Sequence, residues 1–135
     1  MFKGLGGDSR SGGSPDFSSV DSREKAEALY QRGELQKVLL MPAEFGGQEI
    51  PPNVVYVPGW AAEMKANIDL NIIKPLVAAG RVSRYQATPE YQGNSFIPIS
   101  LSISATQPES FSARVGIWGK GLRDGTTPPN IGGLE

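Results

Sequence analysis

The chain contains neither cysteine nor histidine. Without cysteine there is no disulfide and no thiolate nucleophile, and without histidine there is no imidazole acid or base near neutral pH. These two residue types also supply most ligands of zinc and iron–sulfur sites, so the sequence predicts no metal site and no cofactor. Carboxylates, hydroxyls, amines and guanidinium groups supply the chemistry that remains.

Net charge is nearly absent as well. The chain has 13 Lys and Arg against 14 Asp and Glu, which gives a formal net charge of −1. A charge this small creates no long-range field that would steer the protein toward a polyanion or a membrane surface. Nucleic acid and membranes are therefore disfavoured as partners.

Long apolar runs are also missing. No run approaches the roughly 18 residues of a membrane span. The first five residues are interrupted by Lys3 and Gly4, which is too early for the apolar region of a signal peptide. Phe2 stands where N-myristoylation requires glycine. These features predict a cytoplasmic protein.

Glycine and proline, by contrast, are plentiful, with 17 and 11 copies, and nine of the glycines lie in residues 1–20 and 121–135. Residues 1–20 are rich in glycine and serine, and residues 121–135 are rich in glycine, threonine and proline. Such segments bury too little apolar surface to offset the entropy lost on ordering. The composition predicts a disordered N-terminal arm over 1–20, a single domain over 21–120, and a disordered C-terminal tail over 121–135.

The first half of the predicted domain begins with a helix. Asp21 is placed to accept from free amides at the helix start, and Glu24 can reach back as in a capping box. The helix ends near Arg32, before Gly33. Two strands follow, over 35–41 and 54–57. The connection between them, residues 43–52, contains adjacent glycines and adjacent prolines that prevent strand pairing.

The longest predicted helix spans residues 60–79, where apolar residues recur at helical spacing. They form two rows, which predict a face wide enough to lie across a sheet: Met64, Ile68, Ile72 and Leu76 in one row, and Ala66, Leu70, Ile73 and Val77 in the other. The predicted solvent-facing stripe consists of Glu63, Asn67, Asn71 and Lys74, with Lys65 and Asp69 as an i, i+4 pair beside it. Pro75 lacks an amide N–H, so we expect a kink or break near Lys74.

Three further strands are predicted over 82–87, 97–104 and 111–118. The second is the clearest, because Ile97, Ile99, Leu101 and Ile103 alternate with small polar residues and proline. The resulting order is α-β-β-α-β-β-β. It predicts an α+β fold, with a mainly antiparallel sheet of about five strands and two helices on one face.

The outer face of this sheet is the main candidate binding surface. The alternation places these residues on it: Arg84, Ser100, Ser102, Ser112, Arg114 and Trp118. A tryptophan with arginines on an open serine surface has the composition of the anchors of protein interfaces. The alternative is an arginine stem that packs over a partly exposed tryptophan and shields it.

The 43–52 loop is the second candidate. Glu44 and Glu49 flank two glycines, with Phe45 between them. Two carboxylates that converge could bind a hard cation or share a proton as an acid–base pair. The alternative, which is favoured, is a solvated loop, although loops of this length are sometimes lids or binding loops.

These observations predict a non-catalytic small domain that binds another macromolecule. We expect a protein partner, or a second copy of the chain, at the open sheet face and the 43–52 loop. One alternative is a small-ligand binder or enzyme that depends on the carboxylates of Glu44 and Glu49. A further alternative is a single-stranded nucleic-acid binder that stacks bases on Trp118, which the net charge disfavours.

Overall fold

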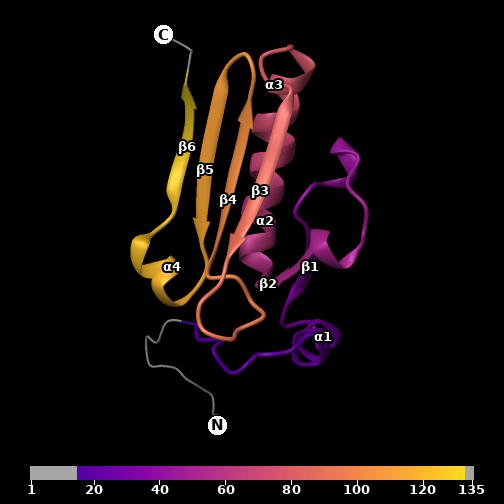
Figure 1. The fold of residues 1–135 in the computed structure, drawn as a ribbon, viewed down its shortest axis with the longest axis vertical. Coiled ribbons are helices and arrows are strands. Elements are labelled where there is room, and N and C mark those ends of the chain that lie inside the picture. The colour runs from indigo at the N-terminus through magenta and orange to yellow at the C-terminus, as the bar shows by residue number, and fades with distance from the viewer. Residues whose placement is uncertain (1–14, 133–135) are drawn as a thin grey trace.

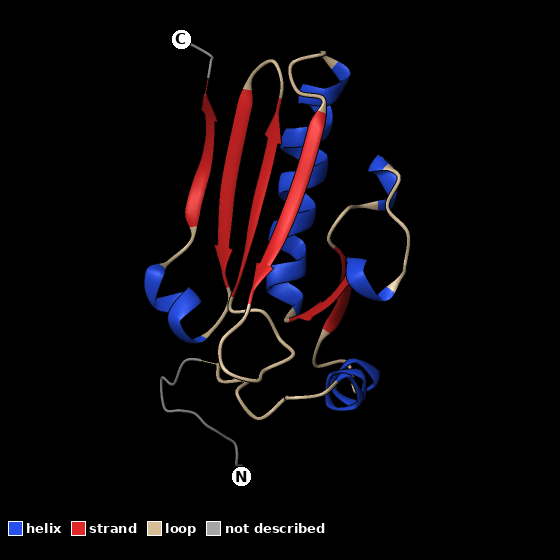
Figure 2. Ribbon diagram, in the orientation of Figure 1, coloured by secondary structure: helices blue, strands red, loops and turns tan. Residues whose placement is uncertain are grey.

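The structure is a computed structural model that describes residues 15–132, with side chains described for residues 15–126. It confirms the α+β class (Figures 1 and 2). The helices are α1 (Arg23–Gln31), α2 (Gly59–Asn67), α3 (Lys74–Ala78) and α4 (Gly119–Asp124), with short helical segments η2 (Ala43–Phe45), η3 (Pro51–Asn53) and η4 (Ile68–Ile73). The strands are β1 (Gln36–Leu39), β2 (Val54–Val57), β3 (Arg84–Glu90), β4 (Ser100–Thr106), β5 (Ser110–Gly116) and β6 (Thr127–Gly132).

The strands divide into two antiparallel sheets. β1 and β2 form a separate two-stranded sheet, whereas β3, β4, β5 and β6 form a four-stranded sheet in that order. Figure 1 shows the β1–β2 pair to one side of β3, with the long helical segment behind the larger sheet. β2 is only four residues long, leads through Pro58 directly into α2 and pairs with β1 alone.

The core lies between α2 and the inner face of the four-stranded sheet. The apolar row of Ile97, Ile99, Leu101 and Ile103 is buried, as the alternation predicts. Ile103 pairs with Ala87 on one side and Ala113 on the other. Each fully buried aliphatic side chain contributes about 1.5–3 kcal/mol before entropy. This apolar layer fixes which sheet face is inward and which is open.

The long helix changes its hydrogen-bonding pattern where a break is predicted. α2, η4 and α3 follow one another without a gap, and η4 is a π-helix. Pro75 is near the start of α3. Proline cannot donate the helical hydrogen bond to the preceding turn, and the π-helical segment ends two residues before Pro75.

The buried face of this helix differs from the prediction. Lys65 and Asp69 are buried, whereas Met64, Leu70 and Val77 are exposed. Successive residues are about 100° apart on a helix, so Met64 and Ala66 stand on either side of Lys65. Ile68, Ile73 and Leu76 from the two predicted rows are buried as predicted, and they share the buried face with Lys65 and Asp69.

Part of the predicted N-terminal arm packs against the domain. The Phe17 ring meets Trp118 edge-on, with ring centroids 6.2 Å apart. The Ser95 hydroxyl donates to the Phe17 carbonyl at 2.8 Å, and the Phe96 amide donates to the Val20 carbonyl at 2.6 Å. These contacts tie residues 17–20 to the loop before β4. The prediction for residues 1–14 lies outside the described residues.

The C-terminal segment also differs from the predicted disordered tail. Over residues 121–132 the chain forms most of α4 and all of β6, which pairs antiparallel with β5. Gly121 allows α4 to lie against the chain before β4, because a Cβ at this position would lie 1.9 Å from the Ile99 carbonyl oxygen. Over the described residues, no helix is both long and apolar enough to cross a membrane.

Candidate functional site

The outer face of the four-stranded sheet is polar, as predicted. Cross-strand pairing places Ser102 between Thr88 and Arg114, and Ser104 between Gln86 and Ser112. Ser102 and Ser112 are exposed, and so is Arg84, the first residue of β3. Short hydroxyl side chains therefore cover the centre of this face.

Trp118 does not lie on this face, and its predicted role as an interface anchor is wrong. Only 2% of the residue is exposed. Its indole N–H donates to the Ile97 carbonyl at 2.9 Å, and its ring packs against Phe17. β5 ends at Gly116, so the strand alternation no longer applies two residues later.

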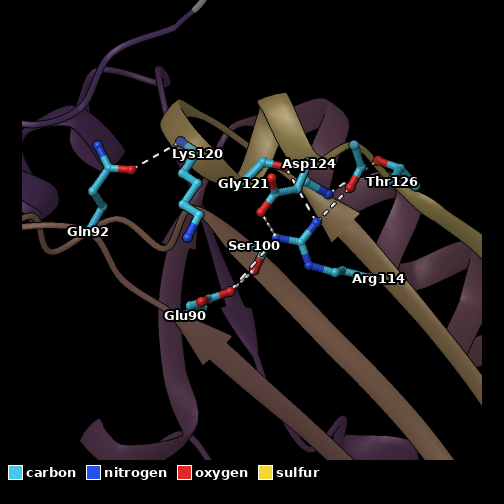
Figure 3. Close-up of polar contacts among 10 residues, drawn as sticks. Glu90, Gln92, Ser100, Arg114, Lys120, Gly121, Asp124 and Thr126 are labelled. Atoms are coloured by element: carbon cyan, nitrogen blue, oxygen red, sulfur yellow. Dashed lines mark hydrogen bonds and ion pairs between the residues drawn. The ribbon is translucent and has the colours of Figure 1, made fainter.

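Ser100 is the second predicted surface residue that the structure removes from solvent. It points outward by strand alternation but is fully buried beside α4. Its hydroxyl donates to the Glu90 carboxylate at 3.1 Å (Figure 3). Ser100 therefore stabilises the end of the sheet and is not available to a partner.

Arg114 is half-buried and holds the C-terminal segment in place. Its guanidinium donates to the Gly125 carbonyl at 2.6 Å and lies 3.7 Å from Glu90 and 4.0 Å from Asp124 (Figure 3). In the same region the Lys120 amide donates to the Gln92 side chain at 3.0 Å. Arg114 thus links β5 to the turn after α4, which is a structural role.

Trp118 and Ser100 are buried, and Arg114 binds the C-terminal segment. The exposed part of the sheet face therefore has no aromatic residue that could anchor a partner. Its depressions are shallow, and one of about 330 Å³ lies over Thr88, Ser102 and Ser112. Protein interfaces draw most of their affinity from buried aromatic and arginine residues. The polar sheet face alone is therefore a weak binding surface.

The 43–52 loop, in contrast, is a closed structure whose ends meet. The Leu40 amide donates to the Asn53 carbonyl at 2.8 Å. The Asn53 side chain accepts from the Met41 amide at 2.8 Å and donates to the carbonyls of Met41 and Gln48 at 3.0 and 2.9 Å. Compact loops with adjoining ends and internal packing are frequently functional.

Three further contacts fix the conformation of this loop. Gly47 lies so close to Met41 that an added Cβ would be 1.7 Å from the Met41 carbonyl oxygen. The Lys37 ammonium contacts the Glu49 carboxylate at 3.2 Å. The Phe45 ring packs on Tyr85, with centroids 5.1 Å apart. The loop is thereby attached to both β1 and β3.

The tip of the loop is apolar and faces solvent. Ile50 is 48% exposed, and Pro51 and Pro52 are exposed beside it. Both prolines belong to η3, which ends at Asn53. The hydrogen bonds of Asn53 therefore hold the tip, which we define as Ile50-Pro51-Pro52.

The structure gives Glu44 and Glu49 different surroundings. Glu49 pairs with Lys37, whereas Glu44 lines a cavity with Lys65 and Asp69. Over the residues whose side chains are described, no group of three or more acidic side chains could hold a metal ion.

Three predicted residues do converge. Glu44 and Phe45 from the loop and Arg84 from β3 all line a cavity of about 340 Å³. The loop and the Arg84 end of the sheet are therefore neighbours.

A buried charged cluster lies beneath this loop, where the sequence pattern predicts a solvent-exposed pair. The Lys65 ammonium donates to Asp69 at 2.6 Å and to the Tyr85 hydroxyl at 3.2 Å. The Tyr85 hydroxyl donates to the other Asp69 oxygen at 2.7 Å. The side chains of Lys65 and Asp69 are only 2% and 4% exposed. The cluster joins α2 to β3 through the core.

Burial governs the protonation of this cluster. Loss of solvent lowers the pKa of Lys65 and raises the pKa of Asp69, while the attraction between the two charges opposes both shifts. Burial also raises the pKa of Tyr85, and the adjacent Asp69 carboxylate adds to that shift. Titratable groups perturbed in this way next to a cavity are typical of functional sites, although structural ion pairs also produce them.

A larger cavity, of about 510 Å³, lies elsewhere, between residues 15–18 and α4. Its charged lining residues, Asp16 and Arg123, are both exposed. It therefore offers no desolvated charged group comparable to Lys65.

Comparison of the chain with known protein families, with curated proteins and with solved structures finds no match of any of the three kinds.

Proposed function

We propose that this protein is a non-catalytic binding module that holds a protein partner through the 43–52 loop. The observation that carries the proposal is the apolar tip, Ile50-Pro51-Pro52, on a loop that the Asn53 hydrogen bonds already hold in one conformation. The partner is either another protein or a second copy of this chain.

The rigidity of the loop favours binding. A flexible loop loses conformational entropy when a partner orders it, whereas a preorganised loop has already lost that entropy on folding. Proline restricts the tip further, because its ring fixes one backbone angle. Burial of an exposed isoleucine side chain contributes about 1.5–3 kcal/mol.

Polar residues near the loop suit the rim of such an interface. Glu44 and Arg84 line the same cavity as Phe45, and both are exposed. Interfaces commonly surround an apolar centre with polar, solvent-accessible groups. The outer sheet face beyond Arg84 extends this rim with hydroxyl side chains, and it is the less important part of the proposed surface.

The two alternatives from the sequence have less support. An acid–base or metal-binding pair requires Glu44 and Glu49 to act together, and Glu49 is engaged by Lys37. Base stacking on the sheet requires an exposed aromatic ring, and Trp118 is buried. The cytoplasmic location stays a prediction of the sequence.

Site-specific photocrosslinking tests the proposal. A photoreactive amino acid is placed at Gln48 in the loop or, as a matched control, at Ser112 on the sheet face; both positions are exposed. We expect one discrete crosslinked partner from position 48 and little from position 112. A second copy of the chain as partner would give a crosslinked dimer.

The substitution Ile50→Glu in the position-48 protein supplies the decisive comparison. Because Ile50 is largely exposed, the fold should persist, as circular dichroism will show, while the crosslink disappears. An undiminished crosslink after Ile50→Glu, or the same partner captured more strongly from position 112, would reject the loop as the binding surface.

A further inference from the structure

β1 has a free edge, and its pairing with β2 shows which backbone groups lie on that edge. The Leu40 amide donates across to the Asn53 carbonyl. In an antiparallel pair, residues that bond across the ladder alternate with residues that do not, so the N–H and C=O groups of Lys37 and Leu39 point away from β2. Over the described residues β1 pairs with β2 alone. Such an edge is a template on which a further strand can pair.

A groove runs along this edge. Val38 and Leu39 both line a hollow of about 300 Å³, and none of the described β2 residues does. Successive side chains of a strand point to opposite faces, so a hollow that reaches both residues lies beside the strand, on the side away from β2. The opposite wall is the long helical segment, where Ala62, Ala66 and Leu70 follow one another at a spacing of about one turn. We call this hollow the β1–α2 groove.

The walls of the β1–α2 groove suit an extended chain. Ala62 and Ala66 have short side chains, which leave room for another backbone between the strand and the helix. A hollow of about 300 Å³ has the volume of roughly ten liquid waters, which suits one aliphatic side chain beside the paired backbone. When a peptide adds to a sheet edge, main-chain hydrogen bonds supply affinity and such a side-chain pocket supplies specificity. A third strand would also stabilise a two-stranded sheet, which is only marginally stable alone.

The charges of the lining indicate the chemistry of the segment that fits. Lys65 and Asp69 compensate each other, whereas Glu44 is exposed and has no ion-pair partner among the described residues. The lining therefore has a net negative charge, which attracts a basic side chain. The β1 strand of a second copy offers Lys37, but Glu49 of that copy already binds this ammonium. A segment of a different protein therefore fits better than a second copy.

We propose that the β1–α2 groove binds an extended segment of another protein, which adds to β1 as a third strand. The segment places an aliphatic side chain against Leu70 and a Lys or Arg near Glu44. This inference goes beyond the loop proposal, because the tip Ile50-Pro51-Pro52 is not part of the groove lining. Either proposal can fail its test while the other passes.

Selection of random octapeptides displayed on phage, with the full chain as the immobilised target, tests the proposal. We expect the enriched peptides to share an aliphatic residue close to a Lys or Arg. Ala66→Leu fills the groove from an exposed helix position and should lose these peptides. Ala78→Leu, which is exposed and outside the lining, should keep them. Failure to enrich any peptide, or enrichment of the same peptides on Ala66→Leu, would overturn the proposal.

Leu39→Pro tests the strand pairing itself. Proline removes the amide on the free edge, and an edge strand tolerates it there because this amide does not bond to β2. Leu39→Ala is the matched control, since it also loses the leucine side chain but keeps the amide. Isothermal titration calorimetry with an enriched peptide should show about tenfold weaker binding to Leu39→Pro than to Leu39→Ala. Equal affinities would contradict strand addition at β1.

Sedimentation of the full chain without peptide distinguishes a second copy as the occupant of the groove. We expect Leu39→Pro to leave the oligomeric state of the chain unchanged. A dimer that Leu39→Pro converts to a monomer would show that β1 pairs with β1 of a second copy, and it would overturn the assignment of the groove to a different protein.

Discussion

Lys65 in α2 and Asp69 in η4 lie one turn apart on the buried face of the long helical segment, where their side chains form an ion pair of 2.6 Å that is almost completely shielded from solvent. Removing two charges from water costs several kcal/mol each, and only good geometry with further hydrogen bonds offsets that cost. Tyr85 supplies two such hydrogen bonds from β3. The three side chains therefore position α2 against the edge of the sheet and shape the cavity beside it.

Removal of one partner of this pair should destabilise the fold strongly. Lys65→Met leaves the Asp69 carboxylate buried without its counter-charge, which typically costs about 3–5 kcal/mol. The double variant, Lys65→Met with Asp69→Leu, should lose less unfolding free energy than the two single variants lose together, because no uncompensated charge remains. Urea denaturation of the four proteins measures this. Strictly additive losses would mean that the two charges do not interact.

Tyr85 should make stability fall at high pH. Burial and the Asp69 carboxylate raise the pKa of Tyr85 above its ordinary value of 10.0. Above pH 10 the unfolded chain loses this phenol proton while the folded protein keeps it, so the unfolded state binds fewer protons. The free energy of unfolding should therefore fall by about 1.4 kcal/mol per pH unit from this group.

Tyr85→Phe isolates that contribution. The difference in unfolding free energy between the wild type and Tyr85→Phe should be constant up to about pH 10 and then shrink as pH rises. Urea denaturation at a series of pH values between 9 and 11 measures the difference. A difference that stays constant over this range would show that the Tyr85 phenol ionises as easily in the folded protein as in the unfolded chain.

The two tryptophans should report opposite environments. Trp118 is buried, whereas Trp60 is 42% exposed. The Trp60→Phe protein, which retains Trp118, should emit at shorter wavelength and resist quenching by acrylamide. The Trp118→Phe protein should emit at longer wavelength and be quenched readily. The opposite result, in which Trp118 emits at longer wavelength and is quenched readily, would show that Trp118 lies on the protein surface.

Gly47→Ala should disrupt the loop. The added methyl group would lie 1.7 Å from the Met41 carbonyl oxygen, so the backbone must move, at a cost of about 1–3 kcal/mol for overpacking. The Met41 amide, which donates to Asn53, should then exchange its hydrogen faster. Gln48→Ala is the control, because its side chain is exposed. Equal amide exchange in both variants would contradict the close approach at Gly47.

The central strand of the large sheet was predictable because one face of it is apolar. The alternation of Ile99, Leu101 and Ile103 with serines specifies both the strand and its inward face. The same rule failed for Trp118, because strand periodicity holds only while the chain stays extended. After Gly116 the chain leaves the sheet and enters α4, and residue type alone does not mark that change of direction.

The buried pair of Lys65 and Asp69 was missed for a different reason. Opposite charges at i and i+4 usually lie on the solvent-exposed face of a helix. That rule places Lys65 and Asp69 beside the solvent-facing stripe. Lys65 has apolar neighbours at Met64 and Ala66, and Asp69 has them at Ile68 and Leu70; on a helix these neighbours lie on either side of the charged residue, which is the sequence signal for burial that the i, i+4 rule overrode. Tyr85, the third member, comes from β3, so its contact with α2 depends on tertiary packing.

The C-terminal elements depend on contacts that composition does not reveal. α4 and the turn after it are held by Arg114, whose guanidinium donates to the carbonyls of Gly121 and Gly125. A glycine-rich segment has little intrinsic preference for order. The order of α4 and β6 therefore comes from their contacts with β5, which lies earlier in the chain.

The rigidity of the 43–52 loop is measured most directly by backbone ¹⁵N relaxation of the unbound protein. If the Asn53 hydrogen bonds hold the tip ready for a partner, the order parameters of residues 43–50 and of Asn53 should match those of β3 and β4, at about 0.85. Values below about 0.6 in the loop alone would contradict a preformed binding surface.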